Sequence, residues 1–412
     1  MIPIKYFCHI TSTFTPYMSL YTTIAPITIT CHNRIAPYLE QEVRELGFTV
    51  EETFITGVRL SGTINDCIRL NLNLRCASQV LYSLIQFEAT DADDVYKNLC
   101  DYPWENILPD PGFFSVTSNV LNDTINNSMF ANLRVKDAIV DRIRTKRGTR
   151  PSTGPALDGA VIHLFWKNEH AEVFIDTSGD SLARHGYRKI PGGAPMLESL
   201  AAATIFAGKW DRVSPFVNPM CGSGTLAIEA ALIATNTRPG LFRLNYAFMH
   251  LAGYDDEVYL QQMELLNKQI IDIPGLTIIA TDRSEFAVAN AKKNAVAAGV
   301  ADLIKFGVCD FEDTDVPEGM NGVVYMNPEY GMRLGEEQAL EEVYSRIGDF
   351  MKKKCGGYFG YIFTGNPNLA KKIGLKAKRR IEFYNSTIDC RLMEFELYGG
   401  SRRTMRHRDE PE

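Results

Sequence analysis

Residues 214–234 read SPFVNPMCGSGTLAIEAALIA, and the fold follows from this stretch. A short apolar run leads into a turn with two closely spaced glycines, and TLAIEAALIA then reads as a helical segment. Gly222 and Gly224 let the backbone turn tightly and approach a ligand, while the first turn of the helix presents free N–H groups. The stretch predicts a strand, a ligand-binding turn and a helix, although a lone GxG pair also occurs in turns that bind nothing.

The same rhythm continues toward the C-terminus. Short β-branched or aromatic runs recur at 214–218, 276–282, 303–310, 322–327 and 357–363, separated by helical segments. Strands in this alternation build a mostly parallel sheet with helices on both faces. Ligands bind such α/β sheets at the carboxyl ends of the strands, so the residues that follow each strand are the candidates for function.

Acidic residues follow two of these strands. Asp282 ends LTIIATD, where a carboxylate beside a glycine-rich turn can accept both hydroxyls of a ribose. It can equally cap the helix that begins near Ser284. Asp310 ends the next strand, and its carboxylate can accept an adenine amino group, although a loop aspartate is at least as common an interpretation.

A fourth motif, Asn327-Pro328-Glu329-Tyr330, ends the strand GVVYM. The Asn side-chain oxygen and the following carbonyl can accept the two protons of a planar –NH2 group, and the Tyr ring can stack on a base. Acceptors on both protons leave the nitrogen lone pair aimed at an electrophilic methyl group. A simple Asn-Pro turn is the alternative.

The order of the motifs is more specific than any one of them. A glycine turn, two acids and Asn-Pro-x-Tyr at four successive strand ends fit a nucleoside-bearing methyl donor and an amine acceptor. A nicotinamide dehydrogenase prefers GxGxxG and has no use for the fourth motif. The second half of the chain is therefore predicted to transfer a methyl group.

The first half predicts smaller α+β units. Residues 27–62 read as strand, helix, a strand from Phe48 (FTVEE) and a further strand, and residues 64–176 alternate helices and strands, with Asp91 near a helix N-cap. The Gly-, Pro- and Ser-rich stretch 177–195 marks a domain boundary. A chain of 412 residues favours two or three domains, in agreement with this division.

Net charge argues weakly against a nucleic-acid partner, but local charge permits one. The formal net charge is −7, whereas residues 134–150 hold seven Lys and Arg against two Asp, and residues 351–380 hold nine without an acid. Solvated helix faces explain either patch equally well. From the first patch we take as RNA-binding candidates Lys136, Arg144, Lys146, Arg147 and Arg150.

Other features limit the class of protein. The nine cysteines form no CxxC pair and no run of about 18 apolar residues exists, so we expect reduced thiols, no metal, no membrane partner and a cytoplasmic location. Residues 1–25 are hydroxyl-rich and lack a signal-peptide pattern. We interpret them as a disordered or non-native extension, with Met18 as an alternative start.

Several stretches together resemble the THUMP-domain RNA methyltransferases, in particular the bacterial 23S ribosomal RNA guanine-N2 branch. The matching stretches are VKDAIVDRIRTKRGTRPS, VFIDTSGDSLARHGYRKIPGGAPMLESLAAA, NPMCGSGTLAIEAALIATNTRPGL, IATDRSEFAVANAKKNAVAAG and NPEYGMRLG. The resemblance spans about residues 26–400. It implies a ferredoxin-like unit at 26–80, a THUMP domain at 81–178, and at 179–400 a Rossmann-like, mostly parallel seven-stranded methyltransferase sheet, with a tail at 401–412.

The resemblance also implies roles for the motif residues. S-adenosylmethionine is the implied cofactor, and its implied ligands are Asn218, Met220, Cys221, Gly222, Gly224, Thr225, Asp282 and Asp310. Asn327, Pro328 and Tyr330 are the implied catalytic residues, which hold a guanine whose exocyclic amine attacks the methyl group. Glu198 and Glu229 either order the donor pocket or serve as helix-surface or capping residues, and a structural role is expected for His185.

Two positions depart from the family pattern. Asp usually stands at the place of Asn218, and an amide there lacks the charge that suits the ammonium group of the donor. The family usually reads NPPY, whereas this chain has Glu329, and proline restricts the preceding backbone. Asn218→Asp is therefore expected to tighten donor binding.

The alternatives are a transfer RNA guanine-N2 methyltransferase and a catalytically weakened RNA-binding or ribosome-assembly protein. A third is methylation of a protein glutamine amide, against which the RNA-binding half argues.

Overall fold

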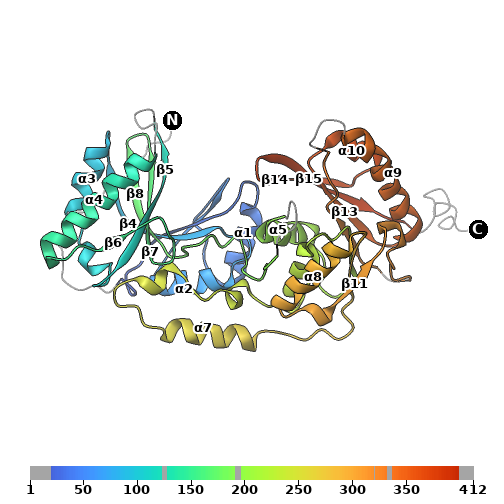
Figure 1. The fold of residues 1–412 in the computed structure, drawn as a ribbon, viewed down its shortest axis with the longest axis horizontal. Helices are drawn as coiled ribbons and strands as arrows, with labels where there is room; N and C mark the ends of the chain where they lie inside the picture. The colour runs from blue at the N-terminus through green and yellow to red at the C-terminus, as the bar shows by residue number, and fades with distance from the viewer. Residues whose placement is uncertain (1–19, 123–127, 191–195, 320, 332–335, 399–412) are drawn as a thin grey trace, which may run out of the picture.

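The computed structural model describes residues 20–122, 128–190, 196–319, 321–331 and 336–398. Within these ranges the chain forms an 8-stranded and a 7-stranded sheet, and the two lie toward opposite ends of the molecule (Figure 1). The expected extension at 1–25 lies outside the described residues up to residue 19, as does the tail at 401–412. No helix of the described ranges is both long and apolar enough to cross a bilayer.

The N-terminal elements begin at the end of that extension. They are β1 (Ala25–Thr30), α1 (Ala36–Glu45), β2 (Glu52–Phe54), β3 (Gly57–Gly62), α2 (Ile64–Asn73) and β4 (Gln79–Glu88). The strand predicted from Phe48 is wrong over residues 48–51. The Phe48 N–H bonds the carbonyl of Val43 at the end of α1, so the backbone there closes the helix, and the strand begins only at Glu52.

The next elements extend the same sheet. They are α3 (Ala92–Cys100), η1 (Trp104–Asn106), β5 (Phe113–Leu121), α4 (Ser128–Arg147), β6 (Ser152–Thr153), β7 (Ala160–Lys167) and β8 (His170–Asp176). The predicted N-cap is confirmed, since Asp91 accepts from the N–H groups of Asp93 and Asp94. The strand order is β2-β3-β1-β4-β8-β7-β5-β6, so β4 pairs with β1 on one edge and with β8 on the other. The two predicted α+β units thus share one continuous sheet.

The C-terminal half contains the second sheet. Its elements are α5 (Glu198–Gly208), β9 (Phe216–Pro219), α6 (Thr225–Ala234), η2 (Pro239–Phe242), η3 (Ala247–His250), α7 (Glu257–Lys268), β10 (Ile278–Asp282), α8 (Glu285–Ala297), η4 (Ala301–Leu303), β11 (Ile304–Val308), η5 (Phe311–Asp313), β12 (Val323–Met326), α9 (Glu336–Lys354), β13 (Phe359–Thr364), α10 (Pro367–Lys372), β14 (Arg379–Asn385) and β15 (Ile388–Glu396). The order is β11-β10-β9-β12-β13-β15-β14, with β15 antiparallel to both of its neighbours. The predicted fold class is confirmed.

Helix α6 is completely buried. Every one of its residues is buried, which suits a helix that is apolar on all sides. Shortly after α6 the chain meets the N-terminal half at Gly240 of η2, where a β-carbon would lie 2.5 Å from the carbonyl oxygen of Leu72 in α2. Helix α7 runs along the lower edge of the molecule, below α2 (Figure 1).

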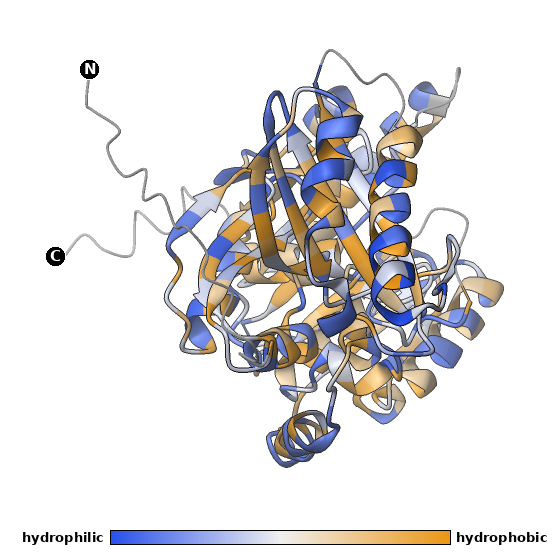
Figure 2. Ribbon diagram, turned by 90° about the vertical axis from the view of Figure 1, so that its left-hand side faces the viewer, coloured by the Kyte–Doolittle hydropathy of each residue, from blue (hydrophilic) through white to orange (hydrophobic). Residues whose placement is uncertain are grey.

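Apolar and hydrophilic residues alternate along many strands and helices, as expected for elements that are buried on one side (Figure 2). In the second sheet the rings of Phe216, Tyr325 and Tyr361 stack in a row, with centroids 5.0 and 4.4 Å apart. The row packs against the end of α5, where the Tyr325 hydroxyl donates to the carbonyl of Thr204. Close packing of this kind leaves no room for an added methyl group.

Gly208 tests this packing. A β-carbon at that position would lie 1.7 Å from the Tyr325 hydroxyl oxygen. We expect Gly208→Ala to lower the free energy of unfolding by about 1–3 kcal/mol, the usual cost of overpacking, measured by urea denaturation. Tyr325→Phe removes the clashing oxygen, so the alanine should cost less in that background. Equal costs in the two backgrounds would contradict the assignment.

Candidate methyl-donor and amine-acceptor site

The four sequence motifs meet at one edge of the second sheet. The strands β11, β10, β9 and β12 are parallel neighbours in that order, so their carboxyl ends lie side by side. The glycine turn after β9 therefore has the acids of β10 and β11 on one side and the Asn327 motif after β12 on the other. This is the topological switch point at which doubly wound sheets bind their ligands.

The glycine turn has the strained backbone of a close-approach loop. Met220, Gly222 and Gly224 adopt positive φ angles of 58°, 55° and 83°. A β-carbon on Gly224 would lie 2.9 Å from the Ala291 side chain, so this glycine allows α8 to pack closely. A β-carbon on Gly222 would meet nothing within 4 Å, so the open side of the turn lies at Gly222.

Asp282 links this turn to the neighbouring strand. One carboxylate oxygen accepts from the Gly222 N–H at 3.0 Å, and the other accepts from the Ser284 N–H at 2.9 Å. The helix cap predicted as its alternative role is instead provided by Ser284, whose side chain accepts from the Ala287 N–H, while Asp282 holds Ser284 and the glycine turn. A carboxylate offers about four lone-pair positions, so two bonds leave capacity for ribose hydroxyls.

Asn218 has a structural function that the sequence did not predict. Its side-chain N–H donates to the carbonyl of Tyr325 in β12 at 2.8 Å, which ties the two central strands together. Its side-chain oxygen is buried without a hydrogen-bond partner among the described residues. An unpaired buried acceptor at the end of β9 fits a cationic donor group such as the ammonium of S-adenosylmethionine.

Asp310 already has a charged partner. It accepts from the Glu312 N–H and pairs with Arg346 of α9 at 3.0 Å, and Arg346 also pairs with Glu312. The sequence reasoning missed Arg346, because no local pattern links α9 to the end of β11. The guanidinium lies 5.1 Å from the Phe311 ring centroid and positions the loop expected at the adenine.

The acceptor motif is closed by its own tyrosine. The Tyr330 hydroxyl donates to the side-chain oxygen of Asn327 at 2.8 Å, and the ring packs 6.4 Å from Phe363. Burial raises the pKa of Tyr330 well above its usual value, so the phenol stays protonated. The Glu329 carbonyl accepts from the Tyr344 hydroxyl, which fixes the turn without the second proline of the family.

The first residue of α6 is held from outside the sheet. Thr225 accepts from Arg188 at 2.9 Å, and Arg188 also bonds the Met196 carbonyl and pairs with Glu198. Cys221, beside the glycines, is buried, and burial with the nearby Asp282 raises the pKa of its thiol to about 12. Cys221 is therefore a packed neutral group rather than a nucleophile.

The structure divides the RNA-binding candidates into two groups. Arg144, Lys146 and Arg150 are exposed. Arg147 instead donates to the carbonyls of Glu105, Leu108 and Pro109, and Lys136 lies 3.7 Å from Asp137. Most cations of the second basic stretch pair with acids. Among the described residues no group of three or more potential metal ligands occurs.

The second sheet, with its ligand-binding strand ends, and the α+β half that precedes it have the architecture of known family models. The family model described as the RMKL-like methyltransferase domain matches residues 185–394, the RlmL ferredoxin-like domain matches 26–81, and the THUMP domain matches 89–176. The chain belongs to the RMKL-like methyltransferase family. The resemblance stated from the motifs is confirmed.

Individual relatives are similar over most of the chain. The "Ribosomal RNA large subunit methyltransferase K/L" of Syntrophotalea carbinolica is 36% identical over 90% of this chain, which spans 54%, about half, of that relative. The "Putative RNA methyltransferase slr0064" of Synechocystis sp. is 30% identical over 91% of this chain and 98% of its own.

A solved structure supports the cofactor. SMU.472, a putative methyltransferase complexed with SAH, superposes with a TM-score of 0.82 at 28% identity over 92% of this chain and 99% of its own. The cofactor predicted from the sequence, S-adenosylmethionine, is the one that the family and this bound ligand indicate.

The bond from Asn218 to Tyr325 adds an expectation about the stability of the Asn218→Asp variant. A carboxylate would face the Tyr325 carbonyl without a donor, so we expect the free energy of unfolding to fall by about 1–3 kcal/mol at pH 8. The pKa of the new carboxyl would be raised, and a protonated acid can donate, so the deficit should shrink as pH falls toward 5. A pH-independent deficit in urea denaturation would show that this bond is unimportant.

The division of the basic residues predicts separable effects on RNA binding and stability. Arg144→Ala, Lys146→Ala and Arg150→Ala should each weaken RNA binding and reduce the salt slope by about 1, with unchanged stability. Arg147→Ala should instead lower the free energy of unfolding by about 1–3 kcal/mol, because it leaves three loop carbonyls without their donor. Fluorescence anisotropy at several salt concentrations and thermal melts measure both quantities.

Proposed function

We propose that the chain transfers a methyl group from S-adenosylmethionine to the exocyclic N2 amine of a guanine in large-subunit ribosomal RNA. The observation that carries the proposal is the adjacency of two strand ends. The glycine turn follows β9, Asn327 follows β12, and these strands are paired. A base amine held at Asn327 therefore lies next to a donor held at the turn.

Relatives support the substrate class. The K/L relatives carry ribosomal RNA in their name, and the matching THUMP model supports an RNA-gripping half. We propose that the ferredoxin-like unit covers residues 26–80, the THUMP domain 81–178 and the catalytic domain 179–400, in a cytoplasmic protein. Transfer RNA is the alternative substrate of the same site.

The residues of this chain position rather than activate the acceptor. S-adenosylmethionine supplies an electrophilic methyl group. The Asn327 side-chain oxygen and the Pro328 carbonyl accept the two amine protons, which directs the nitrogen lone pair at the methyl carbon. The new N–C bond forms as the C–S bond breaks, and the methylated nitrogen releases its proton to water. Alignment of the two reactants supplies much of the rate enhancement.

Tyr330 must change its contacts for this reaction. Its hydroxyl holds the Asn327 oxygen that the amine needs, and its ring lies against Phe363. A base that enters the site therefore displaces the hydroxyl and gains the ring as a stacking surface. Base stacking on an aromatic ring is worth about 1–3 kcal/mol, enough to offset one lost neutral hydrogen bond.

Radiolabelled methyl transfer to separate pools of unmodified ribosomal RNA, transfer RNA and protein tests the proposal. We expect N2-methylguanosine in the ribosomal pool. Label in the transfer RNA pool would identify transfer RNA as the substrate instead. Label on protein glutamine would refute an RNA substrate. No label in any pool, without donor binding in calorimetry, would favour an RNA-binding protein that lacks the chemistry.

The variant Asn327→Ala distinguishes binding of the acceptor base from binding of the methyl donor. We expect it to abolish methylation and to leave the affinity for S-adenosylhomocysteine nearly unchanged, because Asn327 lies on the acceptor side of the turn. The matched control is Asn385→Ala, which removes only a weak 3.5 Å contact to Tyr330 and should retain activity. Equal loss of donor affinity and methylation in Asn327→Ala would contradict the division.

A further inference from the structure

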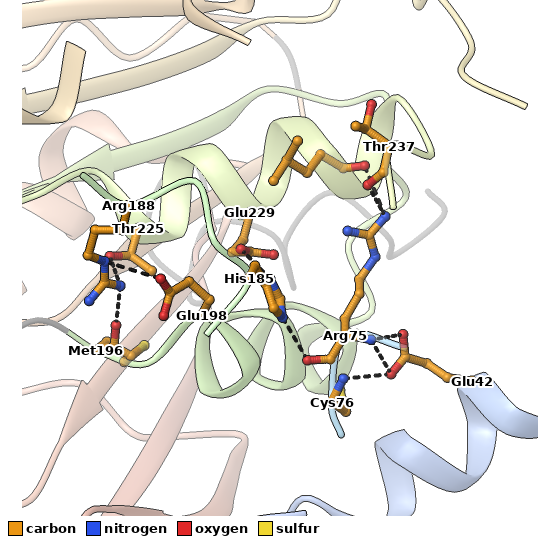
Figure 3. A network of polar contacts seen from close by, with 11 residues as sticks. Glu42, Arg75, Cys76, His185, Arg188, Met196, Glu198, Thr225, Glu229 and Thr237 are labelled. Atoms are coloured by element: carbon orange, nitrogen blue, oxygen red, sulfur yellow. Dashed lines mark hydrogen bonds and ion pairs between the residues drawn. The ribbon is translucent and has the colours of Figure 1, made fainter. Parts of the chain in front are cut away.

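A buried polar network joins the N-terminal half to helix α6 behind the donor turn (Figure 3). Its central contact joins His185 of the segment after β8 to Glu229 of α6, with Nδ1 and Oε1 2.8 Å apart and both side chains fully buried. Glu229 lies one helical turn after Thr225, the first residue of α6. Neither group takes part in the proposed reaction.

The partners of both ring nitrogens favour a charged pair. The second ring nitrogen of His185, Nε2, lies 2.9 Å from the carbonyl oxygen of Arg75. The Arg75 carbonyl only accepts hydrogen bonds, so Nε2 must donate; when the Glu229 carboxylate is ionised, Nδ1 must donate as well and the ring is an imidazolium. Burial alone lowers the pKa of His185, but the Glu229 carboxylate and the Arg75 carbonyl more than offset it, and the pKa lies above its usual value.

Arg75 extends the network to both ends of the connection. Its guanidinium donates to the carbonyls of Leu232 and Thr237, which closes the C-terminal end of α6. Its backbone N–H, like that of Cys76, donates to the carboxylate of Glu42 in α1. The ferredoxin-like unit thus binds the C-terminal end of α6, whose N-terminal end directly follows the glycine turn.

We propose that His185 and Glu229 are positioning residues for methyl-donor binding: their ion pair fixes α6, and with it the glycine turn, so donor affinity falls when His185 loses its proton. The inference rests on the proposed function, because it concerns the same donor site. It assigns to the pair a role in ligand affinity beyond that of a buried structural contact.

Other charged groups face the pair from each neighbouring element. Glu198 comes from α5, and Tyr187 and Arg188 come from the segment that contains His185. The N-terminal unit contributes Arg75, Cys76 and Glu42. Burial raises the pKa values of Glu198 and Glu42. When these carboxyls lose protons they add negative charge that favours the imidazolium, so their titration has the opposite sign to the proposed effect.

The test measures the affinity for S-adenosylhomocysteine by calorimetry between pH 6 and 9, with the full chain. The parent should bind most tightly below the raised pKa of His185 and more weakly above it. The isosteric Glu229→Gln should bind about 2- to 30-fold more weakly at pH 7, the range seen for residues that act through a packed network, and should lack this pH step. The ammonium of the ligand titrates equally in both proteins, so their difference isolates the pair.

Glu42→Gln is the matched control, since it alters a buried carboxylate at the other end of the network. It should lower stability but keep the pH step of the parent. His185→Gln provides a second route if Glu229→Gln does not fold, with the same expected loss of the step. Identical pH profiles for parent and pair variants, or the same change in Glu42→Gln, would overturn the inference. A parent that binds no ligand at any pH would overturn the proposed function and this inference with it.

Discussion

Helix α6 has no exposed residue, and its polar groups must find partners inside the protein. An unpaired buried carboxylate or helix end costs several kcal/mol, so Glu229 and the last carbonyls of α6 require donors. Those donors come from His185 and Arg75, and the Thr225 hydroxyl receives one from Arg188 (Figure 3). All three lie outside the seven-stranded sheet, in segments that precede it along the chain.

This constraint explains why the two halves of the chain are structurally coupled. The glycine turn is short and strained, and its position depends on the helix that follows it. Because α6 is held by the N-terminal unit, the donor site is shaped by residues more than 100 positions away, such as Arg75. The buried helix α6 thus connects the N-terminal half, through Arg75, with the glycine turn.

The sequence was most informative where function is local. Residues 218–225, Asp282, Asp310 and the Asn327 motif were all found as features of strand ends, and the sheet order then placed those ends together. The strand order itself was not predicted, since periodicity states which segments are strands and leaves their pairing open. β4 shows this limit, because its pattern predicted a strand of one small unit, whereas it bridges two.

For the same reason, the sequence could not predict which side chains far apart along the chain would contact each other. Nothing local in the sequence indicates that Asn218 donates to Tyr325, that Arg346 reaches Asp310, or that Tyr330 turns back onto Asn327. These contacts change the meaning of the departures from the family pattern. Asn218, proposed as a ligand of the methyl donor, also ties two strands together, and the Glu329 turn is fixed by Tyr344 in place of a proline ring.

The interpretation of the basic stretches, which was based on charge counts, also changes once their long-range partners are known. The stretch 351–380 holds nine cations without an acid in its own sequence, yet most of them find carboxylates on α9 and β15. A cation engaged by a neighbouring carboxylate releases fewer counterions from a phosphate backbone than a free one, because its charge is already compensated. We therefore expect the exposed Arg144, Lys146 and Arg150 near the end of α4 to contribute more to RNA affinity than the larger basic stretch, because their position in the fold leaves their charge available.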